Sequence, residues 1–331
     1  RVVDDGVRDV EVPASWYRGR GLSVDRDGGV WVNAEMMAYR LGQPNQPGWA
    51  EGRSGLTTTA DGTLWGGLES SPDDWTLSSF DGESWTERAT LDRAQVIGIA
   101  TTPDGTAWAT MADSSQCPKD VSTPTCRRTL LVRMDEAGAS TSFGWEGAEP
   151  GRLAWHEPVV SPDGDLWLVD GGDTETEVAS VAAFYHYDGT DWHTVTVPEG
   201  LTTAPNGQSF GFGPDGTLWA ATTAGRVDSD YPFVPNYGLA RLDDSGWTVF
   251  TEADGVQAWG GQDPWTASDY LQVATDGTVW VTGADDRTDC AGLATFDGTA
   301  WTPYLPGYCI RGLGTTPAGN VWVLASESLG R

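Results

Sequence analysis

Short apolar runs of about five to eight residues alternate with clusters of Gly, Pro, Asp, Ser and Thr along the whole chain. No stretch carries apolar residues at helical spacing over three turns. The runs also lack a clean alternation of apolar and polar residues, as expected for strands in a sheet that is covered on both faces. We therefore expect an all-β protein with few helices or none.

The turns between the apolar runs repeat. Six copies of Asp-Gly-x-(Leu/Val/Ala)-Trp and a weaker seventh copy recur at intervals of 34 to 61 residues. They are Asp27–Trp31, Asp61–Trp65, Asp104–Trp108, Asp163–Trp167, Asp215–Trp219, Asp276–Trp280 and Ala318–Trp322. Asp-Gly between two strand-like runs predicts a tight hairpin, because Gly accepts the positive φ that the turn needs. The tryptophan that follows is expected to fill the gap between adjacent sheets.

A second hairpin follows most copies and ends in its own tryptophan. These hairpins are Phe80–Trp85, Tyr187–Trp192, Leu242–Trp247 and Phe296–Trp301. Two hairpins per unit give four antiparallel strands, and seven units of about 47 residues suit the blades of a propeller. The sequence therefore predicts a single domain, residues 1–331, folded as a seven-bladed β-propeller of four-stranded antiparallel blades.

The ends of the chain predict how the ring closes. The seventh unit stops soon after the strand-like run 321–325, which leaves no room for its outer hairpin. Residues 1–12 read as strand, Asp-Gly turn and strand. We expect residues 1–12 to form the outer strands of the last blade and to remove exposed sheet edges.

Charge and cysteine content narrow the partners and the compartment. The chain has 19 Lys and Arg against 48 Asp and Glu, a net charge of −29, so nucleic-acid binding is not expected. No apolar run reaches 18 residues, so we expect no membrane insertion by this segment. Pairing Cys117 with Cys126 and Cys290 with Cys309 keeps each disulfide inside one blade and implies an oxidising compartment. Arg1 begins directly in strand-like sequence, as in a mature protein or an excised ectodomain. We expect a secreted or cell-surface monomer.

Loop lengths suggest which face binds. The Asp-Gly turns are tight, whereas the connections at the other ends of the strands carry the long insertions 111–128, 171–180, 224–237 and 252–269. Function concentrates on loops that a rigid scaffold holds, so the loop-rich face is the predicted binding face. The alternative is that insertions are merely tolerated there.

Counting seven residues back from each turn predicts the residues at the mouth of the central channel. This column reads Arg20, Ser54, Ile97, His156, Gln208, Asp269 and Arg311. With neighbours added, the predicted ligand-binding set is Arg20, Arg53, Trp155, His156, Glu157, Gln208, Asp269, Tyr270 and Arg311. Polar groups beside aromatic rings suit a glycan, a peptide or protein, or an anionic small molecule held by arginine. The alternative is a channel lined by polar residues that bind only water.

The segments Phe210–Trp219 and Gly238–Phe250 resemble the two-component-regulator propeller repeat, and the likeness extends over nearly the whole chain. The resemblance implies an extracytoplasmic ligand-binding or sensory propeller. Streptogramin B lyases have a more distantly similar repeat, and such an enzyme would need a catalytic histidine with an acidic partner and a metal. His156 with Glu157 is the one candidate pair. The alternatives are thus a propeller enzyme of lyase or glycosidase type with its site at the channel mouth, and a protein-interaction scaffold. No residue is assigned as catalytic.

Metal-binding signals are weak. No cofactor motif is present, and two acidic clusters, at residues 170–177 and 285–289, could bind calcium through carboxylates. Neither cluster has the ligand spacing of an EF-hand loop. His186 and His193 are expected at the surface of outer strands.

Overall fold

A computed structural model describes residues 22–24, 29–34, 37–40, 53–59, 63–69, 75–91, 93–114, 128–134, 140–143, 158–169, 183–197, 201–202, 210–226, 234–250, 254, 271–283, 292–315 and 321–327. Every element assigned in these ranges is a β-strand, and neighbouring strands pair antiparallel. The all-β prediction is therefore confirmed. Among these residues no helix is long and apolar enough to cross a membrane.

The chain divides into two compact units, Glu11–Val160 and Ser161–Arg331 together with Arg1–Val10. The predicted role of residues 1–12 falls outside the described residues. A single domain and a closed ring of seven blades therefore stay predictions.

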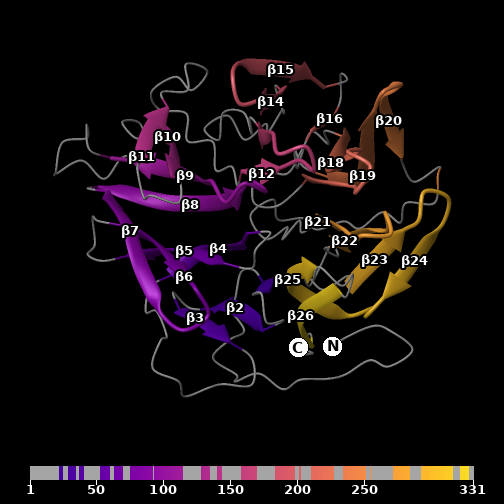
Figure 1. The fold of residues 1–331 in the computed structure, drawn as a ribbon. Helices are drawn as coiled ribbons and strands as arrows, with labels where there is room; N and C mark the ends of the chain where they lie inside the picture. Colours follow the sequence, from indigo (N-terminus) through magenta and orange to yellow (C-terminus); the bar gives the residue numbers. More distant parts are fainter. Residues whose placement is uncertain are drawn as a thin grey trace. The chain divides into compact units, whose positions relative to one another are not determined.

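The unit Glu11–Val160 contains three complete sheets, drawn in indigo to magenta in Figure 1. The first is β1 (Leu22–Val24), β2 (Val30–Ala34) and β3 (Met37–Arg40). The second is β4 (Arg53–Thr58), β5 (Leu64–Glu69), β6 (Trp75–Phe80) and β7 (Trp85–Leu91). The third is β8 (Ala94–Thr101), β9 (Ala107–Asp113), β10 (Arg128–Met134) and β11 (Ser140–Phe143). Each sheet follows chain order, as successive hairpins require.

The remaining sheets are also antiparallel and follow chain order, except that β16 and β17 of the fifth sheet both pair with β18 (Figure 1). The fourth is β12 (Val159–Val160), β13 (Leu166–Val169), β14 (Ala183–Tyr187) and β15 (Trp192–Thr196), and the division between the units falls after β12. The fifth is β16 (Leu201–Thr202), β17 (Phe210–Phe212), β18 (Leu218–Arg226), β19 (Val234–Asp243) and β20 (Gly246–Phe250). The sixth is β21 (Leu271–Val273), β22 (Val279–Gly283), β23 (Gly292–Phe296) and β24 (Trp301–Tyr304). The last pairs β25 (Tyr308–Thr315) with β26 (Val321–Glu327).

The hairpin turns form as the repeat predicts. In the turn between β8 and β9, Thr102 N–H donates to Thr106 O and Gly105 N–H donates to Thr102 O, both at 2.9 Å. Gly105 has φ of 86° there, and the corresponding Gly216 and Gly277 have 84° and 86°. This conformation is strained for residues with a Cβ, which explains the glycine in the motif.

The repeat tryptophans fill the gaps between consecutive sheets, as predicted. Trp31, Trp65, Trp219 and Trp280 are buried. Trp219 packs against Leu271 and Phe296 of the next sheet, and its ring lies edge-on to Phe296 with centroids 5.9 Å apart. Equivalent contacts occur at Trp31, Trp65 and Trp280. Inner strands such as β9 are buried along their whole length, so both faces of these sheets are covered.

One predicted insertion is in part a continuation of the sheet. The segment 224–237 was expected to be a long loop, but β18 continues to Arg226 and β19 begins at Val234, with Arg226 opposite Val234. The short strand β16 pairs with the same end of β18, at Thr223 and Ala224. The fifth sheet therefore has a paired extension where the sequence indicated a loop.

Candidate functional site

Most of the predicted channel-mouth residues lie outside the described residues. These are Arg20, Trp155, His156, Glu157, Gln208, Asp269 and Tyr270. Arg53 and Arg311 are placed by their backbone only, at the start of β4 and in the middle of β25. The predicted disulfides are likewise outside the description, apart from the backbone of Cys309 in β25.

The innermost strands carry a β-bulge near the predicted mouth position. In β8 the register shifts between Val96 and Gly98, so that Ile97 is the extra residue. In β25 it shifts between Ile310 and Gly312, so that Arg311 is the extra residue. Both extra residues belong to the predicted column, and β4 has a register shift between Ser54 and Thr57. A bulge bends its strand and re-aims a side chain, and bulges are enriched next to active sites.

A second group of residues, which was not predicted from the sequence, surrounds the repeat tryptophans. The residue opposite the tryptophan on the third strand is Arg133 for Trp108 and Arg241 for Trp219. These guanidinium carbons lie 5.6 and 5.8 Å from the indole centroids, within the range of a cation–π contact. In the second sheet the same role falls to Arg88, which a bulge in β7 brings 5.9 Å from the Trp65 ring. A guanidinium thus covers the repeat tryptophan in three of the described sheets, whereas Trp280 of the sixth sheet lies opposite Thr295.

The fourth sheet departs from this pattern at three positions. The residue opposite Trp167 is His186, where Arg133 and Arg241 stand in other sheets. The residue opposite His186 on the outer strand is His193, where the other sheets have Thr86, Thr248 and Thr302. The third residue of the turn motif is Asp165, where four other copies have threonine. Asp165, His186 and His193 lie close to one another.

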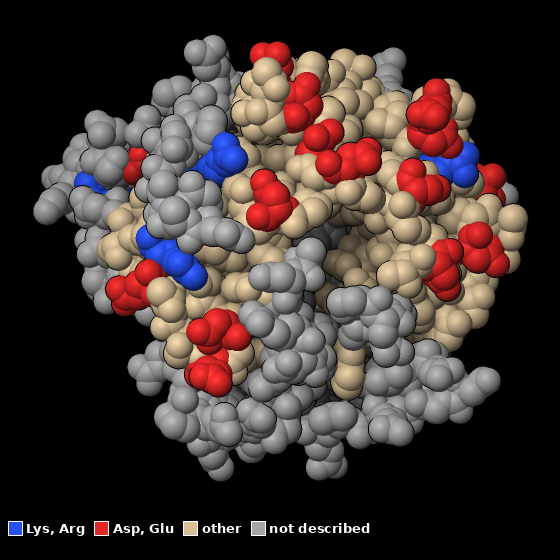
Figure 2. Space-filling view, in the orientation of Figure 1, with Lys and Arg blue, Asp and Glu red and all other residues tan. Residues whose placement is uncertain are grey.

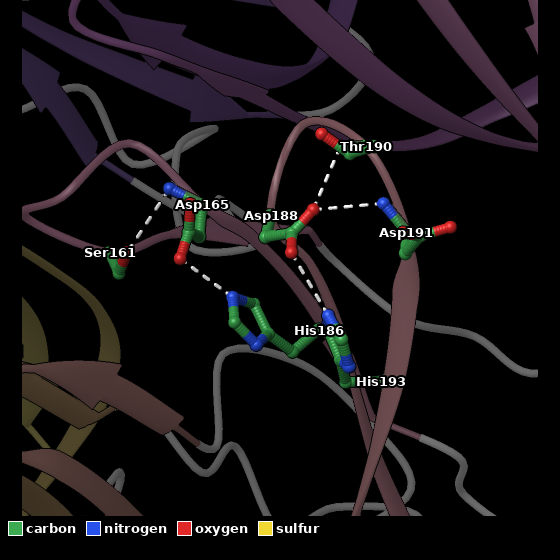
Figure 3. Close-up of polar contacts among 7 residues, drawn as sticks. All are labelled: Ser161, Asp165, His186, Asp188, Thr190, Asp191 and His193. Atoms are coloured by element: carbon green, nitrogen blue, oxygen red, sulfur yellow. Dashed lines mark hydrogen bonds and ion pairs between the residues drawn. The ribbon is translucent and has the colours of Figure 1, made fainter.

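Each of the two histidines forms a hydrogen bond with a carboxylate (Figure 3). His186 Nε2 lies 2.6 Å from Asp165 Oδ2, and His193 Nε2 lies 3.0 Å from Asp188 Oδ2. The two imidazole centroids are 5.6 Å apart because the residues are direct cross-strand neighbours. The His186 ring also stacks on Trp167, with centroids 4.6 Å apart and an interplanar angle of 14°. We call His186, His193, Asp165 and Asp188 the histidine–aspartate group.

Backbone contacts fix the acids of this group. Asp188 Oδ1 accepts hydrogen bonds from Thr190 N–H and Asp191 N–H, both at 2.8 Å. The Asp191 N–H, then the His193 ring and the Thr190 N–H, hold the pKa of Asp188 well below its usual value. Asp165 N–H donates to Ser161 Oγ, which anchors the other turn. The histidine side chains are 20% and 52% exposed, so the group is open to solvent.

The signal for the histidine–aspartate group was present in the sequence. The prediction placed His186 and His193 on outer strands, and they lie on β14 and β15. A comparison of the repeats position by position would have shown the three departures in one unit. What the sequence did not provide was the register that brings Asp165 to His186.

The described residues contain no set of three or more His, Cys, Asp or Glu side chains arranged to hold a metal ion. The two acidic clusters considered for calcium are not among the described residues.

No protein-family model matches the chain, and no curated protein matches it significantly in sequence. Solved structures do resemble it. A streptogramin B lyase matches with a TM-score of 0.61 at 13% identity, over 96% of this chain and 92% of the lyase. The extracellular domain of the putative hybrid two-component system BT4673 from B. thetaiotaomicron matches with a TM-score of 0.59 at 11% identity. That match covers 96% of this chain and 38% of the extracellular-domain chain. YCF48 bound to D1 peptide matches with a TM-score of 0.56 at 14% identity, over 95% of this chain and 92% of YCF48.

These likenesses agree with the Asp-Gly-x-x-Trp repeat and with the succession of antiparallel sheets. The chain therefore has the fold of a β-propeller repeat protein. The similar structures include an enzyme, an extracellular domain and a peptide-bound protein, so the fold alone does not select a function.

Proposed function

We propose that the chain is an extracytoplasmic recognition module, a seven-bladed propeller that binds its ligand at the channel mouth on the loop-rich face. Its ligand is a glycan, a peptide or an anionic small molecule, recognised by the predicted ligand-binding set around Arg311. The likeness to the extracellular domain of BT4673 supports this class of function and the location outside the cytoplasm.

The bulge at Arg311 carries the proposal. It gives β25 one residue more than β26 at the predicted mouth position. The bulge at Ile97 in β8 lies at the equivalent position. Bulges at equivalent positions of several repeats support a function at those positions, because regular strand pairing would be more stable.

A thermal-shift titration of the full chain tests the proposal. The panel consists of glycans, peptidoglycan fragments, nucleotides and divalent ions, and a ligand selective for the native state raises Tm by mass action. We expect the Tm shift of a bound ligand to disappear in Arg311→Ala and in Arg20→Ala. Arg133→Ala is the matched control, because Arg133 covers Trp108 and lies far along the repeat from the bulge position. A ligand that shifts the Arg20→Ala/Arg311→Ala variant as much as the native chain would place the site elsewhere.

The likeness to streptogramin B lyase favours an enzyme as the second candidate. Its site would lie at the same mouth, with His156 and Glu157 as the acid–base pair. Incubation of the panel compounds with the protein and analysis of the products by mass spectrometry separates the two candidates. Turnover that is lost in His156→Ala supports the enzyme, whereas binding without product formation supports the recognition module.

A further inference from the structure

The histidine–aspartate group has the features of a site rather than of a scaffold contact. Arginine covers the repeat tryptophan in three other sheets, and in the sixth sheet Trp280 lies opposite Thr295 and stacks on Tyr304. Threonine stands at the outer position in four sheets, as Thr86, Thr141, Thr248 and Thr302. His186, His193 and Asp165 replace these residues together, and none of the three replacements is required by the packing seen elsewhere in the repeat.

Each histidine is oriented as metal-binding histidines are. A histidine that binds a metal through one ring nitrogen usually donates the N–H of the other nitrogen to a carboxylate. Here the carboxylates of Asp165 and Asp188 face Nε2 of His186 and His193. Between the two neutral tautomers, a carboxylate at this position selects the one with hydrogen on Nε2, in which Nδ1 carries the lone pair that a metal ion binds. Figure 3 shows the second ring nitrogen of each histidine on the side away from its aspartate.

The ring spacing also suits a shared ion. With metal–nitrogen distances of about 2.0–2.1 Å, two imidazoles on one ion have ring centroids about 5–6 Å apart. The observed separation is 5.6 Å. Stacking on Trp167 and the anchored turn of Asp188 reduce the freedom of both rings, so less ordering is needed on binding.

We propose that His186 and His193 form an exposed binding site for a divalent transition-metal ion of the Ni²⁺, Cu²⁺ and Zn²⁺ class. Imidazole nitrogen is a preferred ligand of these ions. The described residues offer no third protein ligand, so water or an external group completes the coordination. The site is thus open, unlike a closed structural zinc site. The surrounding carboxylates favour a cation over an anion at this place.

Calorimetric titration of the full chain with Ni²⁺ tests the site. The test variants His186→Arg and His193→Thr install the residues that stand at the same positions in the fifth sheet, Arg241 and Thr248. We expect each variant to weaken Ni²⁺ binding at least about tenfold and the double variant to abolish it. Because both residues suit the scaffold, Tm should stay close to that of the native chain.

Two further measurements separate the site from other metal binding. Asp165→Asn should weaken Ni²⁺ binding about tenfold through loss of the supporting carboxylate, whereas Asp163→Asn, in the same exposed turn, should not. Electron paramagnetic resonance of the Cu²⁺ complex should show two nitrogen ligands in the native chain and not in the double variant. His156→Ala and Arg311→Ala should leave Ni²⁺ binding unchanged, which keeps this test independent of the proposed ligand site. Absence of Ni²⁺ binding in the native chain, or undiminished binding in the double variant, overturns the proposal.

Discussion

The aspartates of the hairpin turns act as acceptors for backbone N–H groups. Asp297 Oδ1 accepts from Thr299 N–H and Ala300 N–H, and Asp104 Oδ1 accepts from Thr102 Oγ1–H and Thr106 N–H. These bonds are charge-assisted and favour the ionised carboxylate. The pKa of Asp104 is lowered chiefly by the Thr102 hydroxyl, and that of Asp297 chiefly by the Ala300 N–H.

The lowered pKa values predict how stability depends on pH. A carboxyl with a folded pKa below its unfolded value, 3.8 for both aspartates, stabilises the fold above that value. The contribution is lost as pH falls through the lowered folded pKa. We therefore expect Tm to be nearly constant above about pH 5 and to fall steeply below about pH 4.

Asp104→Asn is the variant that isolates this effect. Asparagine retains an oxygen that accepts from Thr106 N–H, but it does not titrate. The difference in Tm between the native chain and Asp104→Asn should be largest at neutral pH and should shrink below about pH 4. A constant difference across the pH range, measured by differential scanning calorimetry, would refute the assignment. Asp163→Asn serves as the control, because Asp163 stands at the same position of the turn motif and is exposed.

Among the elements, the close approach of β5 to β8 depends on a missing side chain. A Cβ at Gly67 would lie 2.8 Å from Val96 Cβ on the neighbouring sheet. Gly67→Ala should therefore overpack this contact and lower the free energy of unfolding by about 1–3 kcal/mol. Val96→Ala should also destabilise, because it removes two methyl groups from a buried position.

The two changes should partly compensate each other. Val96→Ala removes the Cγ atoms that a Cβ at Gly67 would meet at 2.8 and 3.0 Å but keeps the Val96 Cβ at 2.8 Å. The double variant should therefore lose less stability than the sum of the single variants, with part of the overpacking retained. Urea denaturation of the four proteins measures the coupling. Strictly additive losses would show that β5 and β8 do not approach each other as closely as described.

The elements that the sequence predicted are those that local chemistry determines. An Asp-Gly turn forms from the φ of its glycine and the side-chain oxygen of its aspartate, so residues such as Gly105 and Asp104 were sufficient to locate a hairpin. The extension of β18 and β19 was not predicted, because the segment 224–237 was interpreted as a long insertion. Pro235 lies opposite Gly225 of β18, and among the described strands β20 pairs with β19 only at residues 239–243, so no described strand needs a hydrogen bond from Pro235 on that side.

The candidate site, too, could be predicted only where the position within the repeat determines it. Position within the repeat located the column that contains Ile97 and Arg311, and bulges were found at both residues. The pairing of His186 with Asp165 could not be predicted, because it depends on the cross-strand register between β13 and β14. That register is a tertiary property of strands joined by a long connection.

At the scale of the whole molecule, the net charge and the predicted closure of the ring lead to separate expectations. Figure 2 shows acidic side chains of the described residues spread over the surface, with few basic ones between them. The basic residues that are described near the repeat tryptophans contact aromatic rings. The net charge of −29 is therefore expressed at the surface and opposes self-association and binding to polyanions.

Removal of residues 1–12 tests the predicted closure. If this segment completes the last sheet beside β26, its deletion exposes a strand edge and should lower Tm sharply. Addition of the peptide 1–12 in trans should then restore Tm in a concentration-dependent manner, since it binds only the native form. Unchanged melting of the truncated chain, measured by circular dichroism, would contradict the closure.

The extension of β18 and β19 also has a consequence for how this protein can diversify. Side chains alternate along a strand, so residues can be added or removed there only two at a time on each strand if the same faces are to point outward. Each such step changes the reach of the hairpin by about 7 Å and leaves the paired core from Leu218 to Ala221 in register. The fifth sheet thus carries a hairpin extension whose length can change in such steps while the register of the paired core is kept.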